Sequence, residues 1–284
     1  MLPSRYRLMR TRDALRQHTR TISLLVSDLD GTLIPDRWND DARKGLEDLR
    51  QMIVDQGLSV AYATGRHLEL ALEGIERYRL PPPAVLVCDV GTRIYIHDSD
   101  GWIEDEAYAS RIAPKDTAIE HVRVLLDGIP GVTLQEAPKQ GRFKASFYVD
   151  ASTKEERIRE RILSHLGDRA KGFTVIFSID PGDGRGLLDL LPEGASKASA
   201  TAYLGELFEL SSERMLYAGD SGNDVDAMLS GFNAVLVGNA TAAIRAELAA
   251  AAGRSGVREH VYFAKASYAR GVIEGCRHFS FPPG

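Results

Sequence analysis

The sequence has little cysteine, and none of its hydrophobic runs is long enough to cross a membrane. Among 284 residues only Cys88 and Cys276 are cysteines, which excludes a disulfide framework and a CxxC metal site. No run approaches the ~18 apolar residues of a membrane span, and no apolar segment marks a secretory signal. We therefore expect a protein with no membrane partner, and cytoplasmic localisation in a reducing compartment.

A long basic stripe is also missing from the body of the chain. The net charge is −5, which argues against a nucleic-acid partner. Residues 1–20 are the exception, since their acidic residue Asp13 stands against a set of arginines: Arg5, Arg7, Arg10, Arg12, Arg16 and Arg20. An arginine-rich start is typical of transit peptides, but we favour a basic N-terminal extension ahead of the fold.

The most informative stretch is LLVSDLDGTL, from Leu24 to Leu33. The apolar run before it predicts a buried strand, which ends in Asp28 and Asp30 and is followed by Gly31. Side chains two apart on a strand point to the same face, so both carboxylates can converge at its carboxyl end, where α/β sheets bind ligands. Two adjacent carboxylates indicate a hard metal ion or acid–base chemistry, although a lone DxDG also suits a strand followed by a turn.

Strands alternate with helices at both ends of the chain, and sheet-rich sequence interrupts them. This order predicts a parallel α/β core formed by residues 21–97 and 187–284, with an inserted α+β domain at 98–186. The glycine-rich PGDGRG at 181–186 lacks the Lys-Ser/Thr of a phosphate-binding loop, and we interpret it as a hairpin turn.

Polar groups cluster in four places where predicted elements begin or end. They are the DxDGT of Asp28 and Asp30, the ATGR of Thr64 to Arg66, Lys197, and the GDSGND that contains Asp220, Asn223 and Asp224. In this order they match the four motifs of the haloacid-dehalogenase-like phosphatases, which the chain resembles from about Ile22 onward. The resemblance implies a Rossmann-like core with an inserted C2-type cap. One departure is Ala198, where relatives usually have glycine after the lysine.

The resemblance also implies a role for each motif. Asp28 would be the nucleophile that forms an aspartyl-phosphate, and Asp30 the general acid and base. Lys197 would add positive charge at the phosphoryl group or at the nucleophile. Mg²⁺ would be bound by Asp28, the Asp30 backbone carbonyl and Asp220; Thr64, Gly65 and Arg66 would bind the phosphate or substrate; Asn223 and Asp224 would orient the metal's waters and the lysine.

Some of these residues have plainer interpretations that the sequence leaves open. Asn223 and Asp224 also suit a helix N-cap and first turn, and we expect them to do both. Arg66 begins a helix and could be only a surface cation.

The position of the inserted domain bears on the substrate. Only one helix and one strand fit between Asp30 and Thr64, so the insert lies between the second and third motifs, where a cap contacts the leaving group. This favours a small phosphorylated metabolite over a protein substrate. The segments LQEAPKQGRFKASFYVD and LLDLLPEGASKASATAYL, with the ending SYARGVIEGCRHF, resemble the sucrose-phosphate phosphatase branch.

This finer resemblance implies a disaccharide-phosphate substrate. It makes Gln135, Lys144 and Ser146 cap residues that contact sugar hydroxyls, with Asp189 near the junction of cap and core. Lys144 and Ser146 could instead be solvent-facing positions of an alternating strand.

Several alternatives remain open. Sucrose 6-phosphate is the first candidate substrate, with mannosylfructose phosphate and glucosylglycerate-type phosphates as alternatives. A non-catalytic sugar-phosphate-binding partner of a synthase is a second class, disfavoured because Asp28 and Asp30 are both present. Mutases usually carry their cap between the first two motifs, where this chain has no room. We expect a monomer, since the last helix lacks clear heptads, and the basic extension could be the remainder of a linker to a synthase.

Overall fold

The computed structural model describes residues 22–114, 118–127, 129–150, 155–179 and 184–283. The basic extension predicted at 1–20 lies outside these residues. Contacts divide the chain into two compact units: a core unit, which comprises the described residues up to Glu106 and from Lys197 onward, and an insert unit, Ala107–Ser196. Within the described residues, no helix combines the length and apolar character that a membrane crossing requires.

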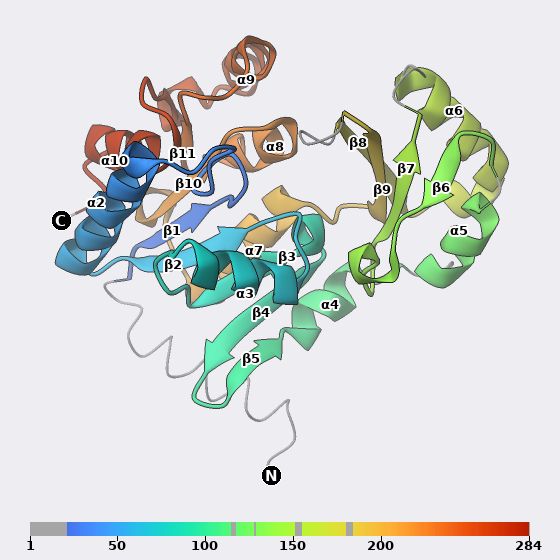
Figure 1. The fold of residues 1–284 in the computed structure, drawn as a ribbon, viewed down its shortest axis with the longest axis horizontal. Helices are drawn as coiled ribbons and strands as arrows, with labels where there is room; N and C mark the ends of the chain where they lie inside the picture. The colour runs from blue at the N-terminus through green and yellow to red at the C-terminus, as the bar shows by residue number, and fades with distance from the viewer. Residues whose placement is uncertain (1–21, 115–117, 128, 151–154, 180–183, 284) are drawn as a thin grey trace. The chain divides into compact units, whose positions relative to one another are not determined.

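The core unit is built on an eight-stranded sheet of order β12-β11-β10-β1-β2-β3-β4-β5 (Figure 1). The six strands from β12 to β3 run parallel, and β4 and β5 are antiparallel additions. Their bounds are β1 (Leu24–Ser27), β2 (Ser59–Ala63), β3 (Val85–Cys88), β4 (Arg93–Asp98), β5 (Gly101–Glu104), β10 (Met215–Gly219), β11 (Asn233–Leu236) and β12 (Val261–Phe263). The fold confirms the predicted α/β class, and the parallel strands are mostly apolar, as expected of strands with both faces buried.

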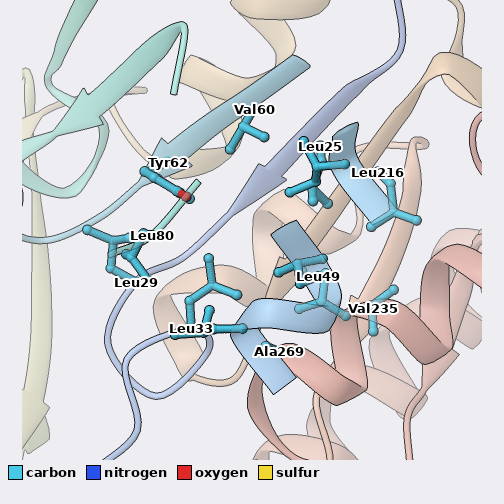
Figure 2. Packing of buried hydrophobic residues seen from close by; sticks show 14 of the residues in the cluster. Leu25, Leu29, Leu33, Leu49, Val60, Tyr62, Leu80, Leu216, Val235 and Ala269 are labelled. Atoms are coloured by element: carbon cyan, nitrogen blue, oxygen red, sulfur yellow. The ribbon is translucent and has the colours of Figure 1, made fainter. Parts of the chain in front are cut away.

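Helices cover both faces of this sheet. They are α2 (Asp40–Gln56), α3 (Leu68–Arg77), α7 (Lys197–Phe208), α8 (Val225–Met228), α9 (Ala242–Ser255) and α10 (Tyr268–His278). Leu49 of α2 and Ala269 of α10 pack with Leu25 and Val235 in one cluster (Figure 2). On the other face, Gly205 of α7 lies against Met215 of β10. Burying a leucine such as Leu49 contributes about 1.5–3 kcal/mol, so this packing holds the strand ends in place.

This topology determines where the predicted motif residues lie. β1 leads into Asp28, β2 into Thr64 and β10 into Asp220, so all three stand at the carboxyl edge of the parallel sheet. From β1 the chain goes to β2 on one side, while β10 lies on the other. This is the topological switch point, where α/β sheets leave room for a ligand.

The insert unit has its own four-stranded antiparallel sheet, of order β6-β7-β9-β8. Its strands are β6 (Val132–Leu134), β7 (Ala145–Val149), β8 (Phe173–Ile179) and β9 (Gly186–Pro192), and its helices are α5 (Ile119–Leu126) and α6 (Glu155–Leu166), with α4 (Glu106–Ile112) at the unit boundary. Alternate residues of β7, among them Phe147, pack into a cluster with Val122 of α5 and Ile162 of α6. The intervening residues therefore face the opposite side of the sheet.

The unit boundaries lie later in the chain than the predicted 98–186. β5 pairs with β4 and so extends the core sheet to Glu104, whereas β9 pairs with β7 and β8 in the insert sheet. The first boundary is decided by the hairpin of β4 and β5, and the second by the pairing of β9 with β7, which is distant in sequence and which hydrophobic pattern alone does not reveal. β8 and β9 are paired as the predicted hairpin requires, while residues 180–183 of its turn lie outside the described residues.

Candidate active site

Asp28 and Lys197 form a buried ion pair at the carboxyl end of β1. The Lys197 Nζ lies 2.9 Å from Asp28 Oδ2, and the lysine is 1% exposed although it starts a helix. The other carboxylate oxygen of Asp28 accepts a 2.7 Å hydrogen bond from the Leu29 backbone N–H. The nucleophile predicted from the sequence is thus held at both oxygens. Ala198 in place of the usual glycine does not prevent the lysine from reaching it.

Asp224 holds the lysine from the opposite side. Its Oδ1 accepts hydrogen bonds of 2.8 Å from Lys197 Nζ and 2.7 Å from the Tyr217 hydroxyl. Its Oδ2 accepts from the backbone N–H groups of Asp220 and Ser221, each at 3.1 Å. With both oxygens engaged, Asp224 serves to orient Lys197. We call Asp28, Lys197, Asp224 and Tyr217 the lysine cluster; Tyr217 was missed in the sequence because it looks like an ordinary strand residue.

Opposite charges within the lysine cluster stabilise each other. Burial lowers the pKa of Lys197, but the carboxylates of Asp224 and Asp28 raise it by more than burial lowers it, so the ammonium stays charged. Burial raises the pKa of Asp28 well above its usual range, and Lys197 opposes that rise. Burial and the nearby Asp224 raise the pKa of the Tyr217 hydroxyl as well, which keeps it a neutral donor. A buried carboxylate of this kind needs a cation beside it to act as a nucleophile at neutral pH.

Asp220 supplies a second carboxylate beside Asp28. Its Oδ1 accepts a 2.9 Å hydrogen bond from the Thr32 hydroxyl, and Gly31 lies so close that a Cβ there would collide with the Asp220 carboxylate. Gly31 also has a φ of 77°, so it meets both demands that favour glycine. Asn239 donates a 2.7 Å hydrogen bond to the Gly31 carbonyl and fixes this turn from the loop after β11.

Three carboxylates could hold a metal ion here. One oxygen from each of Asp28, Asp220 and Asp224 falls within a 4.8 Å group. Each Asp224 oxygen accepts two of the hydrogen bonds described above, whereas each Asp28 oxygen has one such partner, so Asp28 and Asp220 are the better ligands. Burial, and then repulsion by Asp224, raise the pKa of Asp220 to about 7. Buried carboxylates that lie this close together repel each other when both are ionised, and a divalent cation between them would offset the repulsion. Their hard oxygen donors suit a cation such as Mg²⁺.

The loop after β2 carries the threonine motif. Thr64 is fully buried, Gly65 is exposed, and the Thr64 hydroxyl accepts a 3.2 Å hydrogen bond from the Arg66 backbone N–H. The Arg66 side chain is turned to Asp30: its Nε and Nη2 donate to the two carboxylate oxygens at 2.8 and 2.6 Å. Arg66 is therefore not only a surface cation.

A strained turn after β3 supports this loop and was not predicted. Asp89 and Val90 both have positive φ, 52° and 59°, an arrangement that a β-branched residue rarely adopts. The Val90 N–H donates to the Thr64 carbonyl at 3.1 Å, and the Asp89 N–H donates to the Arg66 carbonyl at 2.9 Å. The strain is visible only in the backbone conformation, because the sequence Asp-Val-Gly is not in itself a turn signal.

Asn223 and Asp224 differ from the expected capping arrangement. The capping residue of the short helical turn Gly222–Asp224 is Ser221, which forms a capping box with Asp224. Asn223 is exposed, and its side-chain oxygen accepts a 3.1 Å hydrogen bond from the Ser221 hydroxyl. Asp224 thus lies in the first turn of Gly222–Asp224 as predicted, and it is also the N-cap residue of α8, without a side-chain capping hydrogen bond. Asn223 is the N-cap of neither.

The three residues predicted for sugar contact, and Asp189, which was predicted near the junction of cap and core, all lie on or beside the strands of the insert sheet. Ser146 of β7 is opposite Asp189 of β9, and its hydroxyl donates to the Asp189 carboxylate at 2.5 Å. Gln135 is bonded through its backbone N–H to the Ser146 carbonyl, and its side chain donates to the Phe147 carbonyl at 3.0 Å. We call Gln135, Lys144, Ser146 and Asp189 the insert cluster. Lys144 and Ser146 are 6% and 1% exposed, so they are not solvent-facing positions.

Comparison with known proteins agrees with this geometry. A model of the sucrose-6F-phosphate phosphohydrolase family matches residues 21–280. A HAD-like hydrolase of Nitrosococcus oceani is 33% identical over 91% of this chain and 72% of its own. The mannosylfructose-phosphate phosphatase of Agrobacterium fabrum is 27% identical over 93% and 99% of the two chains.

A solved structure shows the same likeness in three dimensions. The sucrose-phosphatase of Synechocystis sp. PCC6803, solved in complex with sucrose and phosphate, superposes with a TM-score of 0.75 at 27% identity. The match covers 92% of this chain and 99% of that one. Together with the four motifs at one sheet edge, these matches show that the chain is a phosphoric monoester hydrolase and belongs to the sucrose-6F-phosphate phosphohydrolase family.

Proposed function

We propose that the protein hydrolyses a disaccharide phosphate, with sucrose 6-phosphate as the first candidate, and that it requires Mg²⁺. The observation that carries the proposal is the pairing of Asp28 with Lys197 at 2.9 Å, beside the Asp220 carboxylate. The pair presents a buried carboxylate nucleophile together with the positive charge that a dianionic phosphate monoester demands. A non-catalytic protein that only binds sugar phosphates does not require this arrangement.

The first half of the reaction forms a phosphoryl-enzyme. An Asp28 carboxylate oxygen attacks phosphorus in line, the bond from phosphorus to the sugar oxygen breaks, and Asp30 gives its proton to the leaving alkoxide. The Thr64 hydroxyl and the Lys197 ammonium bind phosphoryl oxygens as their charge develops. Bound Mg²⁺, held by Asp28, Asp220 and the Asp30 backbone carbonyl, would supply further charge neutralisation.

The second half regenerates the enzyme. Asp30, now ionised, takes a proton from a water molecule that attacks phosphorus, and the bond between phosphorus and Asp28 breaks to release inorganic phosphate. Asp224 keeps Lys197 in place through both steps by accepting a hydrogen bond from the ammonium, and Tyr217 holds the Asp224 carboxylate by donating to the same oxygen.

The insert cluster is the proposed site of sugar recognition. Ser146 and Asp189 present a hydroxyl and a carboxylate, the groups that bind sugar hydroxyls, and Lys144 adds a positive charge beside them. A polar face with a fixed pattern of donors and acceptors can discriminate between sugars, since a mismatched hydroxyl leaves a buried group unpaired.

Mannosylfructose phosphate is the strongest alternative substrate, because the Agrobacterium relative matches this chain over nearly its whole length. The test is phosphate release from sucrose 6-phosphate, mannosylfructose phosphate and a glucosylglycerate phosphate, with and without Mg²⁺. Preference for sucrose 6-phosphate, abolished in Asp28→Asn, would support the first candidate. Turnover of another glycosyl phosphate would move the assignment to that substrate. If all three yield no phosphate, the non-catalytic alternative would be preferred.

A further inference from the structure

The ion pair between Arg66 and Asp30 engages the whole carboxylate. Two nitrogens of one guanidinium meet the two oxygens of one carboxylate, at 2.6 and 2.8 Å. This bidentate geometry sets the orientation of the carboxylate plane as well as its position. The Asp30 side chain is 54% exposed and that of Arg66 only 19%. The arginine is thus the anchored partner, and the aspartate is the one that would otherwise rotate in solvent.

Arg66 is anchored along its length. Its Nη1 donates a 3.1 Å hydrogen bond to the Leu70 carbonyl in the first turn of α3, and its backbone is held by Thr64 and Asp89. The guanidinium lies over Gly74, also in α3, where an added Cβ would be 2.6 Å from Nη1. Glycine inside a helix lowers helix stability relative to alanine. The presence of glycine at position 74 is explained by the guanidinium, which occupies the space that a Cβ would need.

We propose that Arg66 is a positioning residue that aims Asp30, and that Gly74 provides the space this requires. The inference rests on the proposed function, in which Asp30 transfers protons to and from oxygen atoms at phosphorus. Proton transfer depends steeply on orientation, because the donor must lie within hydrogen-bond reach of the leaving oxygen.

This assignment differs from a direct role in phosphate binding. Three of the guanidinium N–H directions point at Asp30 and Leu70. Loss of an arginine that bound the phosphoryl group would raise KM for every phosphate ester alike. Loss of an arginine that acts through Asp30 lowers kcat/KM only for those esters whose leaving group needs a proton, since a nitrophenolate departs without one. Hydrolysis of the phosphoryl-enzyme, in which Asp30 acts for every ester, does not enter kcat/KM.

The test is a double-mutant cycle read with two substrates. Arg66→Met, Asp30→Asn and the double variant are compared with wild type by kcat/KM on the preferred sugar phosphate and on p-nitrophenyl phosphate. We expect Arg66→Met to lower the sugar-phosphate value by about 10- to 100-fold, a part of the ~10²–10⁴-fold that general acid catalysis contributes, and the aryl value by less than about threefold. In the Asp30→Asn background the second substitution should add no further loss.

Two further variants separate geometry from charge. Arg66→Lys keeps the charge but cannot pair with both oxygens, so it should restore only part of the loss. Gly74→Ala keeps the arginine and displaces it, and should reproduce the selective loss to a smaller extent. Gly253→Ala in α9 is the matched control, because a Cβ there meets nothing within 4 Å. It should leave both substrates unchanged.

The opposite results would overturn the inference. Equal losses on both substrates, with a raised KM, or a further loss in the Asp30→Asn background, would make Arg66 a phosphate ligand. A wild-type protein that releases phosphate from neither substrate would instead overturn the proposed function and this inference with it. A wild type that is active, with an Arg66→Met variant equally active on sugar phosphate, would refute the positioning role alone.

Discussion

The lysine cluster and the insert cluster are both polar groups on otherwise apolar sheets, yet they are secured to different degrees. In the lysine cluster every charge meets an opposite charge or a hydroxyl, and the side chains of Lys197 and Asp224 are fully buried. In the insert cluster the contacts are largely to backbone carbonyls, and Asp189 is only partly buried. A fully satisfied buried network permits one arrangement, whereas a partly exposed carboxylate such as Asp189 can adapt to a ligand. The proposed catalytic step would use the fixed arrangement, and the proposed sugar recognition would use the adjustable one.

The largest effect is expected at the nucleophile. Asp28→Asn keeps the shape of the side chain but cannot attack phosphorus, so kcat should fall by ~10⁴-fold or more, as for other removed nucleophiles. The measurement is steady-state phosphate release with the preferred sugar phosphate. Asp168→Asn, which makes the same change at a 91% exposed side chain, is the control and should retain full activity. Turnover by Asp28→Asn within tenfold of wild type would contradict the assignment.

The next effect concerns stability and tests whether the lysine cluster is one unit. Lys197→Met leaves Asp28 and Asp224 buried side by side without a cation. We expect a loss of about 3–5 kcal/mol in the free energy of unfolding, the usual cost of breaking a buried ion pair. Chemical denaturation measures it.

The control for that stability prediction is an exposed lysine. Lys171→Met removes a cation whose side chain is 79% exposed and paired only with Asp168. Its effect should stay within about 0.5 kcal/mol. Similar losses of unfolding free energy in the two variants would mean that the buried ion pairs of Lys197 stabilise the fold no more than an exposed ion pair does.

The insert cluster should show a smaller and more selective effect. Asp189→Asn removes a charged partner of Ser146, and loss of one hydrogen bond to a charged group costs about 1.5–3 kcal/mol. We expect KM for the disaccharide phosphate to rise by roughly 10-fold or more, with p-nitrophenyl phosphate turnover nearly unchanged. Glu120→Gln on α5, 66% exposed, is the matched acid-to-amide control. Equal losses on both substrates would show that the residue supports folding rather than sugar recognition.

The positions of the core motif residues could be predicted from the sequence for a physical reason. Asp28, Thr64 and Asp220 each follow an apolar strand, and parallel strands bring their carboxyl ends to one edge whatever their order. Local pattern was therefore enough to bring these residues together. It was not enough for Asn239, whose hydrogen bond to Gly31 joins segments far apart in the chain. Nor was it enough for Tyr217, whose partner Asp224 lies in the loop after its own strand, where spacing alone does not show that the two meet.

The limits of the insert were harder for the same reason. β9 has the composition of a core strand, and only its pairing with β7 and β8 assigns it to the insert sheet. The strained Asp89–Val90 turn was equally out of reach, because a valine with positive φ is held by its surroundings and not by its own preference. Residues whose conformation opposes their local propensity are those that sequence patterns miss.

The smallest effect links pH to metal binding at Asp220. The pKa of this carboxyl is raised from 3.8 to about 7 in the folded protein, by burial and then by Asp224. Between those values the folded state binds more protons than the unfolded state. The contribution of Asp220 to stability therefore falls as pH rises from about 4 to 7 in the absence of metal. A cation that binds the ionised carboxylate should reverse this loss.

We thus expect millimolar Mg²⁺ to raise the melting temperature by a few degrees at pH 8 and by less at pH 5.5, where a proton competes for Asp220. Asp220→Asn should abolish most of the pH 8 increase, whereas Asp226→Asn, at an exposed position of α8, should keep it. An equal Mg²⁺ effect at both pH values, or one that survives in Asp220→Asn, would place the cation away from this carboxylate. The lysine cluster would then have to neutralise the phosphate with the charge of Lys197 alone.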